Sequence, residues 1–214
     1  MSGQFPRTHG MVGYCDRTPW HPKATLPGAL SKAGYRTALV GRYMHQHPMR
    51  KRYGFDEAAI QCGIEDADYE AWFRRHAPPG AGGPRGAGIT HNDWTARPWH
   101  LPEWLHYTNW TVSQAEKFLR KRSRGEPFFL VVSFLAPHPP LVPPAFYFER
   151  YWRMKLPRPV TGDWAVPPPK GGVGVPVDSP RVHLRGEALQ ACLAGYFGLI
   201  NHVDDQIRRI LNPV

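Results

Sequence analysis

The fold is decided by residues 25–42, which read T-L-P-G-A-L-S-K-A-G-Y-R-T-A-L-V-G-R. The first part predicts a helix over 23–34, in which Thr25 caps the start, Pro27 suits the first turn and Gly34 suits the left-handed position after the last turn. The run R-T-A-L-V-G, residues 36–41, predicts a short strand that enters the core. A helix, a glycine and a strand in this order are typical of one αβ step of a parallel sheet.

A second step of this kind lies further along the chain. Apolar residues recur at helical spacing in 111–122, and residues 127–134, P-F-F-L-V-V-S-F, form a nearly continuous apolar run of strand length. Because both faces of such a strand are apolar, we expect it to be a central strand of a parallel sheet. The sequence therefore predicts the α/β class, a parallel-rich central sheet flanked by helices, with functional residues at the carboxyl ends of the strands.

The other segments predict two further helices and several loops. A weak helical pattern covers 66–76, and a strong amphipathic pattern covers 187–211. Two segments rich in Pro and Gly, at about 77–90 and 156–186, are expected to be loop insertions. The aromatic, proline-interrupted segment 92–110 predicts an irregular, packed connection, and an aromatic platform for sugars is the alternative.

The charge balance is strongly basic. Lys and Arg number 27 against 17 Asp and Glu, which gives a net charge of +10 and suits a polyanion or an anionic ester as partner. The densest basic run, residues 120–124, falls at the end of a predicted helix, where cations complement the partial negative charge. No nucleic-acid recognition module accompanies it, so we expect no nucleic-acid partner.

Cysteine usage and hydropathy exclude several further classes. Cys15, Cys62 and Cys192 are widely spaced without a C-x-x-C pattern, which indicates neither a disulfide framework nor a zinc site. No run approaches eighteen apolar residues, so no membrane span is expected, and residues 1–7 lack the apolar core of a signal peptide. A natural start upstream of Met1 would leave export open, so the localisation is unknown.

Each predicted strand is followed by a segment that carries histidine. After the first strand, residues 41–47 read G-R-Y-M-H-Q-H, in which Arg42 could hold an oxyanion and His45 could donate a proton to a leaving oxygen. After the second strand, residues 136–140 read A-P-H-P-P, where prolines fix the backbone around His138. Spacing alone leaves open the alternative that these are ordinary surface or structural residues.

Five blocks in a fixed order carry a resemblance to a known family. They are S-G-Q-F-P-R-T-H-G (2–10), the stretch 25–42, Y-G-F-D (53–56), P-F-F-L-V-V-S-F-L-A-P-H-P-P (127–140) and A-G-Y-F-G-L-I-N-H-V-D-D-Q-I-R-R-I-L (194–211). Together they resemble an internal fragment of an arylsulfatase-type sulfatase of the alkaline-phosphatase-like superfamily. The resemblance implies a partial alkaline-phosphatase-like sandwich, incomplete at both ends, and one partial catalytic domain over 1–214.

The resemblance also implies roles for three residues. In the family, a G-K-x-x-H block follows T-L-x-x-x-L-x-x-x-G-Y-x-T, and its Lys binds the sulfate while its His assists. Arg42 stands at the Lys position as a substrate-binding residue, and His45 stands at the His position as a catalytic residue. His138 corresponds to a second sulfate-contacting, catalytic histidine. A planar guanidinium in place of a compact ammonium is not a conservative change in a tight pocket.

The cofactors of the family have no counterpart motifs in this chain. Members of the family hydrolyse sulfate esters of small molecules or glycans with calcium or magnesium and a formylglycine made from Cys or Ser. The C-x-P-S-R or S-x-P-x-R motif and the S-D-H-G or S-D-N-G metal turn are absent, and Asp204 and Asp205 point in different directions on a helix. We expect this chain alone to bind no metal or other cofactor and to be inactive.

Three interpretations of function follow from these observations. The first is a sulfuric ester hydrolase whose sulfate contacts are Arg42, His45 and His138. The second is a pseudoenzyme or anion-binding remnant whose basic charge still attracts sulfated or phosphorylated ligands. The third is a phosphodiester or phosphonate hydrolase of the same superfamily, which would share the fold.

Overall fold

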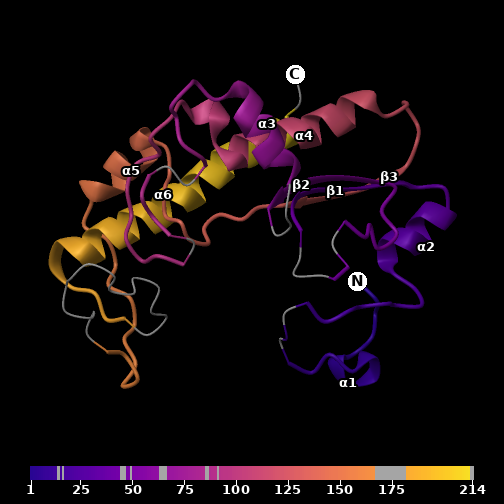
Figure 1. Ribbon diagram of the computed structural model, residues 1–214, viewed down its shortest axis with the longest axis horizontal. Helices are drawn as coiled ribbons and strands as arrows, with labels where there is room; N and C mark the ends of the chain where they lie inside the picture. Colours follow the sequence, from indigo (N-terminus) through magenta and orange to yellow (C-terminus); the bar gives the residue numbers. More distant parts are fainter. Residues whose placement is uncertain are drawn as a thin grey trace. The chain divides into compact units, whose positions relative to one another are not determined.

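A computed structural model describes most of the chain. The described residues are 1–13, 15, 17–43, 47–48, 50–62, 67–84, 87–90, 92–166 and 182–212. They form two compact units: unit 1 combines residues 1–72 with 110–134, and unit 2 combines 73–109 with 135–212. The elements, shown in Figure 1, are α1 (Pro6–His9), α2 (Leu26–Lys32), β1 (Arg36–Arg42), β2 (Glu57–Cys62), α3 (Asp68–His76), η1 (Glu103–Leu105), α4 (Tyr107–Lys121), β3 (Phe128–Ser133), α5 (Ala145–Trp152) and α6 (Gly186–Leu211).

The sheet of unit 1 confirms the α/β class. Its three strands are parallel and lie in the order β2-β1-β3. The expectation that the apolar strand 127–134 is central is wrong within this sheet, because β1 lies in the middle and β3 at one side. A continuous apolar run shows that both faces of a strand are covered but does not specify its neighbours. The position of β1 is instead visible in burial, since its five inner residues are all buried.

Strand β2 is not predicted by the sequence pattern. Its sequence E-A-A-I-Q-C has neither the β-branched content nor the alternation that signals a strand. It forms because it pairs with β1, with Ala38 opposite Glu57 and Gly41 opposite Ile60. Tertiary pairing therefore overrides a weak local preference.

Helix α2 follows the predicted chemistry closely. Thr25 is its N-cap, and the Thr25 side chain accepts a hydrogen bond from the Gly28 amide at 3.2 Å. The same hydroxyl donates to the Tyr53 carbonyl at 2.7 Å. Gly54 approaches so closely that an added Cβ would lie 2.5 Å from the Gly28 nitrogen. The Y-G-F-D block therefore fixes the start of α2 against the chain that leads into β2.

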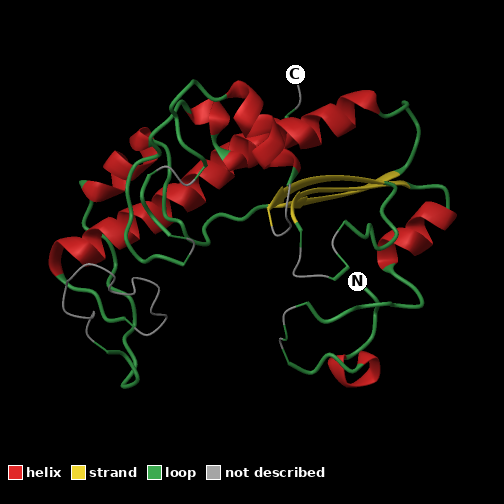
Figure 2. Ribbon diagram, in the orientation of Figure 1, coloured by secondary structure: helices red, strands yellow, loops and turns green. Residues whose placement is uncertain are grey.

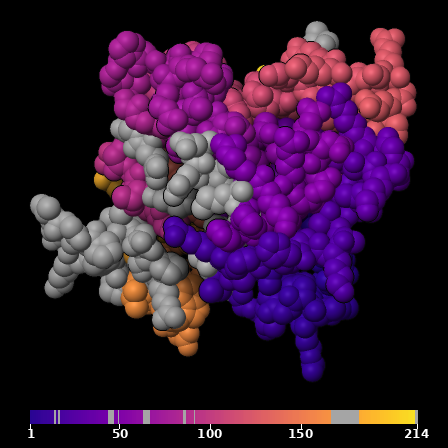
Figure 3. Space-filling model, turned by 45° about the vertical axis from the view of Figure 1, so that its right-hand side comes forward, coloured from indigo at the N-terminus to yellow at the C-terminus, as the bar shows by residue number. Residues whose placement is uncertain are grey.

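Unit 1 has a hydrophobic core cluster that includes residues of β1 and β2. It combines Leu39, Ile60 and Phe55 with the rings of Tyr43 and Tyr53. Figure 2 shows α4 along one side of the sheet and α2 on the other. The amino-terminal residues 1–25, indigo in Figure 3, lie at the surface, and most of those described are exposed. Helices thus cover both faces of the parallel sheet in unit 1, as is usual for sheets built from βαβ units.

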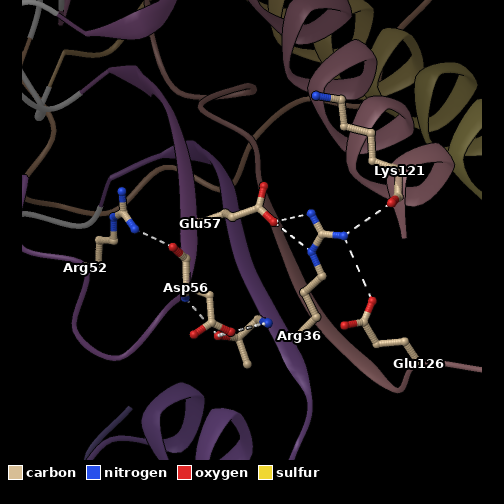
Figure 4. Close-up of polar contacts among 7 residues, drawn as sticks. Arg36, Arg52, Asp56, Glu57, Lys121 and Glu126 are labelled. Atoms are coloured by element: carbon tan, nitrogen blue, oxygen red, sulfur yellow. Dashed lines mark hydrogen bonds and ion pairs between the residues drawn. The ribbon is translucent and has the colours of Figure 1, made fainter. Parts of the chain in front are cut away.

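An ionic network holds the amino-terminal edge of this sheet, and Figure 4 shows it centred on Arg36. The Arg36 Nε donates to Glu57 Oε1 at 2.7 Å, and its Nη1 donates to the Lys121 carbonyl at 3.3 Å. The same guanidinium lies 3.9 Å from the carboxylate of Glu126 and 5.2 Å from the centre of the Phe118 ring. Arg36 therefore links β1 to β2, to the end of α4 and to the turn before β3.

Asp56 forms the second part of this edge. Its carboxylate accepts hydrogen bonds from the Thr37 amide at 2.8 Å, the Thr37 hydroxyl at 2.9 Å and the Ser31 hydroxyl at 2.8 Å. Burial alone raises the pKa of Asp56, but the hydrogen bonds from Thr37 and Ser31 and the charge of Arg52 outweigh it and lower the pKa. Asp56 thus joins α2, β1 and the start of β2 as an ionised carboxylate.

Unit 2 is built on α6, the long amphipathic helix that the sequence predicts at 187–211. Helix α5 packs along α6, and the Tyr151 ring stacks on Phe197 with centroids 5.9 Å apart. The expectation of an irregular connection over 92–110 is wrong at its end, because α4 begins at Tyr107. No proline follows Pro102 until after α4, so the aromatic residues there can continue into the helix. None of the helices in the described ranges combines the length and apolarity needed to cross a membrane.

Candidate functional site

Arg42 stands at the carboxyl end of β1, where the strand geometry changes. Gly41 has φ +107°, and a Cβ at this position would lie 1.9 Å from the Ser133 carbonyl oxygen. Only glycine allows β1 and β3 to approach this closely. The pairing of β1 with β2 also shifts register between Gly41 and Arg42. After this shift the half-buried Arg42 pairs with Cys62 and ends β1 at the carboxyl edge of the sheet.

Cys62 is the register partner of Arg42 and is not a nucleophile. Burial raises the pKa of Cys62 to about 11, while the Arg42 charge opposes this rise and Glu70 adds to it. A thiol with this pKa is protonated at neutral pH, and the thiolate is the reactive form. Arg42 therefore sets a positive potential at this edge without activating the neighbouring cysteine.

Two tyrosines anchor the chain that follows Arg42. The buried Tyr43 hydroxyl donates to the Lys51 carbonyl, and the Tyr53 hydroxyl donates to the His47 carbonyl at 2.8 Å. Burial and the neighbouring Tyr53 raise the pKa of Tyr43 to about 12, so its hydroxyl remains a donor. His45, the predicted catalytic residue in this segment, lies outside the described residues.

His138 follows the end of β3 in a proline-rich turn, as the sequence predicts. Its backbone amide donates to the Leu135 carbonyl at 3.0 Å, and its ring Nδ1 lies 2.6 Å from the Pro139 carbonyl. Because a carbonyl oxygen only accepts, Nδ1 carries a proton. A neutral His138 ring then holds its lone pair on Nε2, and a charged ring presents an Nε2–H donor. The contact with the Pro139 carbonyl therefore fixes the tautomer of the His138 ring.

The structure places Arg42 in unit 1 and His138 in unit 2. Strand β3, which leads to His138, pairs with β1, which ends at Arg42, and Ser133 lies opposite Gly41. The two segments that the sequence singles out thus leave the same edge of one sheet.

His138 also lies on the wall of a large cavity within unit 2, of about 1640 Å³. Three basic side chains that were not predicted as site residues line the same cavity: Lys155, Arg158 and Arg185. The sequence carried a signal for them, since Lys155 and Arg158 are cations within the proline-rich stretch K-L-P-R-P. The predicted loop insertion at about 156–186 contains Arg158 and Arg185 and begins directly after Lys155.

A second group of titratable residues lies in the interior of unit 2. The side chains of His106 and His202 are fully buried, and their rings meet edge to face with centroids 4.8 Å apart. Burial lowers the pKa of His202 to about 3, and burial together with His202 lowers the pKa of His106 well below its usual value. His202 Nε2 lies 3.3 Å from Glu103, but a neutral ring cannot form an ion pair there. These histidines are core residues.

The described residues do not form a metal site. No group of three or more His, Cys, Asp or Glu side chains within the described ranges could hold an ion. Asp204 and Asp205, adjacent on α6, do not belong to such a group. The described residues therefore supply no set of metal ligands.

Comparisons with a family model and with a curated relative point to the same family. The family model described as Sulfatase matches residues 1–214. An arylsulfatase of Clostridium perfringens is 37% identical over 227 aligned residues, which cover 99% of this chain and 47% of that protein. The chain thus spans about half the length of this relative. Members of the family generally use a formylglycine and a divalent metal ion.

Solved structures show the same fold. The phosphonate monoester hydrolase of Agrobacterium radiobacter matches with a TM-score of 0.66 at 19% identity, over 98% of this chain and 47% of that one. A protein crystallised with its substrate D-glucosamine-2-N,6-O-disulfate matches with a TM-score of 0.57 at 17% identity, over 98% of this chain and 50% of that one. With the family match over its whole length, the chain belongs to the sulfatase family.

Proposed function

We propose that this chain is part of a sulfuric ester hydrolase that acts on a sulfated small molecule or glycan. The observation that carries the proposal is the family match over residues 1–214, together with 37% identity to an arylsulfatase. The basic charge of +10 supports it, because it favours the approach of anionic esters.

Arg42 is proposed to bind the sulfate group. Its guanidinium lies at the carboxyl edge of the sheet, and two parallel N–H donors match two oxygens of an oxyanion. His45 is proposed to assist as a proton donor, as the family motif implies for that position. The neighbouring Cys62 is protonated at neutral pH and takes no part.

His138 is proposed as a second contact to the sulfate. The hydrogen bond from Nδ1 to the Pro139 carbonyl holds the ring in one orientation. In its charged form, the ring offers Nε2–H to a sulfate oxygen. In its neutral form, Nε2 can accept a proton instead.

The described residues supply binding and proton transfer, but no metal cluster. Formylglycine and a divalent ion would supply the nucleophile and charge neutralisation in a complete sulfatase. We propose calcium or magnesium as that ion and assign none of its ligands to the described residues. The proposal therefore limits this chain's contribution to holding the sulfate and moving a proton.

A chimera tests the proposal. Residues 1–214 would replace the matching segment of the Clostridium perfringens arylsulfatase, and turnover of an aryl sulfate would be measured with calcium and with magnesium. We expect turnover that falls at least about tenfold in Arg42→Ala and His138→Ala. Arg124→Ala, which removes a cation elsewhere, should leave the rate within about twofold. A folded chimera without turnover would contradict the proposal.

If the chimera does not fold, a binding measurement tests the assignment of Arg42 instead. Sulfate binding to the 214-residue chain would be followed by calorimetry, with Arg42→Ala beside Arg124→Ala. Loss of binding in the first variant alone supports the assignment of Arg42. Equal binding by both variants and the parent chain contradicts it.

Phosphonate ester hydrolysis is the second candidate activity. Proteins with this fold include a phosphonate monoester hydrolase. The same chimera would be assayed with an aryl phosphonate monoester at matched concentration. A larger kcat/KM for the phosphonate would favour this activity, and a larger value for the sulfate would favour the first.

A further inference from the structure

The cavity of unit 2 has the charge of an anion-binding site. Lys155, Arg158 and Arg185 line it together with the rings of His138 and His183. No Asp or Glu is found among its described lining residues, although Asp163 and Glu187 lie close in sequence. The side chains of the three cations make no hydrogen bond or ion pair with any residue in the described part of the chain. Three like charges therefore line one cavity, and none of the described lining residues supplies a counter-charge.

The wall that carries these cations is held in place at both ends. The Gln190 side chain of α6 donates to the carbonyls of Tyr151, Trp152 and Met154, at 3.1, 3.0 and 3.0 Å. These bonds fix the exit of the chain from α5, immediately before Lys155. At the other end, Val166 pairs with Val182, and the His183 amide donates to the Val166 carbonyl at 2.6 Å. The cations are thus presented by a tethered wall that belongs to unit 2.

Aromatic and neutral polar groups complete the cavity. Trp94, Trp164 and Tyr196 contribute to its lining, and the side chains of Trp164 and Tyr196 are 59% and 41% exposed. Figure 3 shows the segment that ends at residue 166, in orange, at the surface. Exposed aromatic faces are suited to stacking on a ring. Asn92 and Thr161, which also line the cavity, offer hydrogen bonds to hydroxyl groups.

The size of the cavity favours an extended ligand. Its volume of about 1640 Å³ exceeds the roughly 300–1,000 Å³ of sites for single small molecules. A ligand that fills it has several rings, hydroxyl groups for neutral side chains and anionic groups for the cations. Sulfated saccharides combine these features.

We propose that the cavity of unit 2 binds a sulfated saccharide, in which Lys155, Arg158 and Arg185 hold a sulfate group other than the one that is hydrolysed. The inference rests on the proposed function only where it takes His138 as the contact to the hydrolysed ester. Substrate selection then depends on a second sulfate, which makes a disulfated saccharide a better ligand than a monosulfated one.

The test is a binding experiment with the 214-residue chain. One disaccharide would be titrated in disulfated, monosulfated and unsulfated forms by calorimetry, at about 0.15 M salt to screen general attraction. We expect the disulfated form to bind at least about tenfold more tightly than the monosulfated form, which corresponds to about 1.4 kcal/mol. A single-stranded DNA oligonucleotide of similar charge density should bind more weakly than the disulfated form.

Matched variants locate the effect. Lys155→Ala and Arg158→Ala should each weaken the disulfated ligand about tenfold and leave the monosulfated ligand within about twofold. Trp164→Ala should weaken all three saccharides alike, because stacking does not depend on sulfate. Arg208→Ala, an exposed cation of α6 that does not line the cavity, is the control for the loss of one charge.

The outcomes separate this inference from the proposed function. Equal affinity for mono- and disulfated forms, equal effects of Arg158→Ala and Arg208→Ala, or equal binding of DNA would each overturn the cavity assignment. Sulfate binding that still depends on Arg42 would leave the proposed function standing in that case. Conversely, disulfate preference in an Arg42→Ala chain would support the cavity even if the chimera showed no turnover.

Discussion

The two ends of the sheet in unit 1 use polar residues in different ways. At the amino-terminal edge, Arg36, Glu57 and Glu126 neutralise one another, and Asp56 ties α2 to β1 and β2. At the carboxyl edge, Gly41 allows β1 and β3 to approach closely, and Arg42 pairs with Cys62 after a shift in register.

The difference teaches that charged side chains set the geometry of one edge of the sheet and close backbone contact sets that of the other. At the amino-terminal edge, opposite charges lie within ion-pair distance, so their interactions are already made in the folded chain. At the carboxyl edge, the close backbone contact at Gly41 sets the geometry, and Arg42 is the last residue of β1 that pairs with β2. Substitutions at the first edge should therefore change the free energy of unfolding, whereas substitution of Arg42 should change binding.

The largest effect is expected for Gly41→Ala. An added Cβ would lie 1.9 Å from a backbone oxygen, and φ is +107°, so the substitution combines a clash with an unfavourable conformation. We expect a loss of about 3 kcal/mol or more in the free energy of unfolding, measured by urea denaturation. Gly34→Ala is the control, since Gly34 has φ +86° and nothing within 4 Å, and it should cost only about 1 kcal/mol. Similar losses in both variants would show that the close contact at Gly41 contributes no more to stability than an ordinary glycine with positive φ.

The next effect concerns binding alone. Arg42→Ala should weaken sulfate binding by about 2 kcal/mol, the range of a hydrogen bond to a charged group, while the urea midpoint changes little. Arg42→Lys should recover part of the affinity, because it keeps the charge and loses the planar fork. A large fall in the urea midpoint of Arg42→Ala would show that the carboxyl edge also serves stability, and the contrast between the edges would disappear.

A smaller effect is expected for Asp56→Asn, which removes the charge that three hydrogen bonds stabilise. The free energy of unfolding should fall by about 1–2 kcal/mol at neutral pH. Because the pKa of Asp56 is lowered in the folded chain, its contribution is present above the ordinary value of 3.8 and is lost as pH falls below it. The difference between parent and variant should therefore shrink below about pH 4, and a difference that stayed constant to pH 2 would count against this account.

The smallest effect is expected for the ion pair between Arg36 and Glu57. The Glu57 side chain is 49% exposed, so solvent screens the pair, and Glu57→Gln should cost less than about 1 kcal/mol. Raising the salt concentration to about 1 M should reduce the cost further. Sulfate binding should not change, and a change would indicate that the amino-terminal edge also influences the ligand.

Much of the fold is predictable because local signals and tertiary packing agree. Thr25, Pro27 and Gly34 mark α2 by their individual chemistry, and the apolar stripe of α6 is long enough to determine its period. Strand β2 is not predictable, because its alanines carry no strand signal and only the pairing with β1 makes it a strand. No prediction from the sequence covers Ala145–Trp152, which form helix α5.

The candidate site is predictable only in part. Arg42 and His138 follow strands whose sequences are clear, so their places at strand ends can be inferred from order along the chain. Arg185 lies far in sequence from Lys155 and Arg158, and no periodicity predicts that the three line one cavity. The tether formed by Gln190 is a contact between distant residues, which a single sequence does not reveal.

The buried pair His106 and His202 has a consequence for how unit 2 exchanges protons with its solvent. Both rings are neutral in the folded chain at pH 5, whereas in the unfolded chain they have ordinary pKa values near 6.5. Unfolding near pH 5 therefore takes up about two protons, and the stability of unit 2 declines as pH falls below 6.5. Calorimetry in buffers of different ionisation enthalpy would register this uptake, and replacing His202 by Phe should reduce it by about one proton.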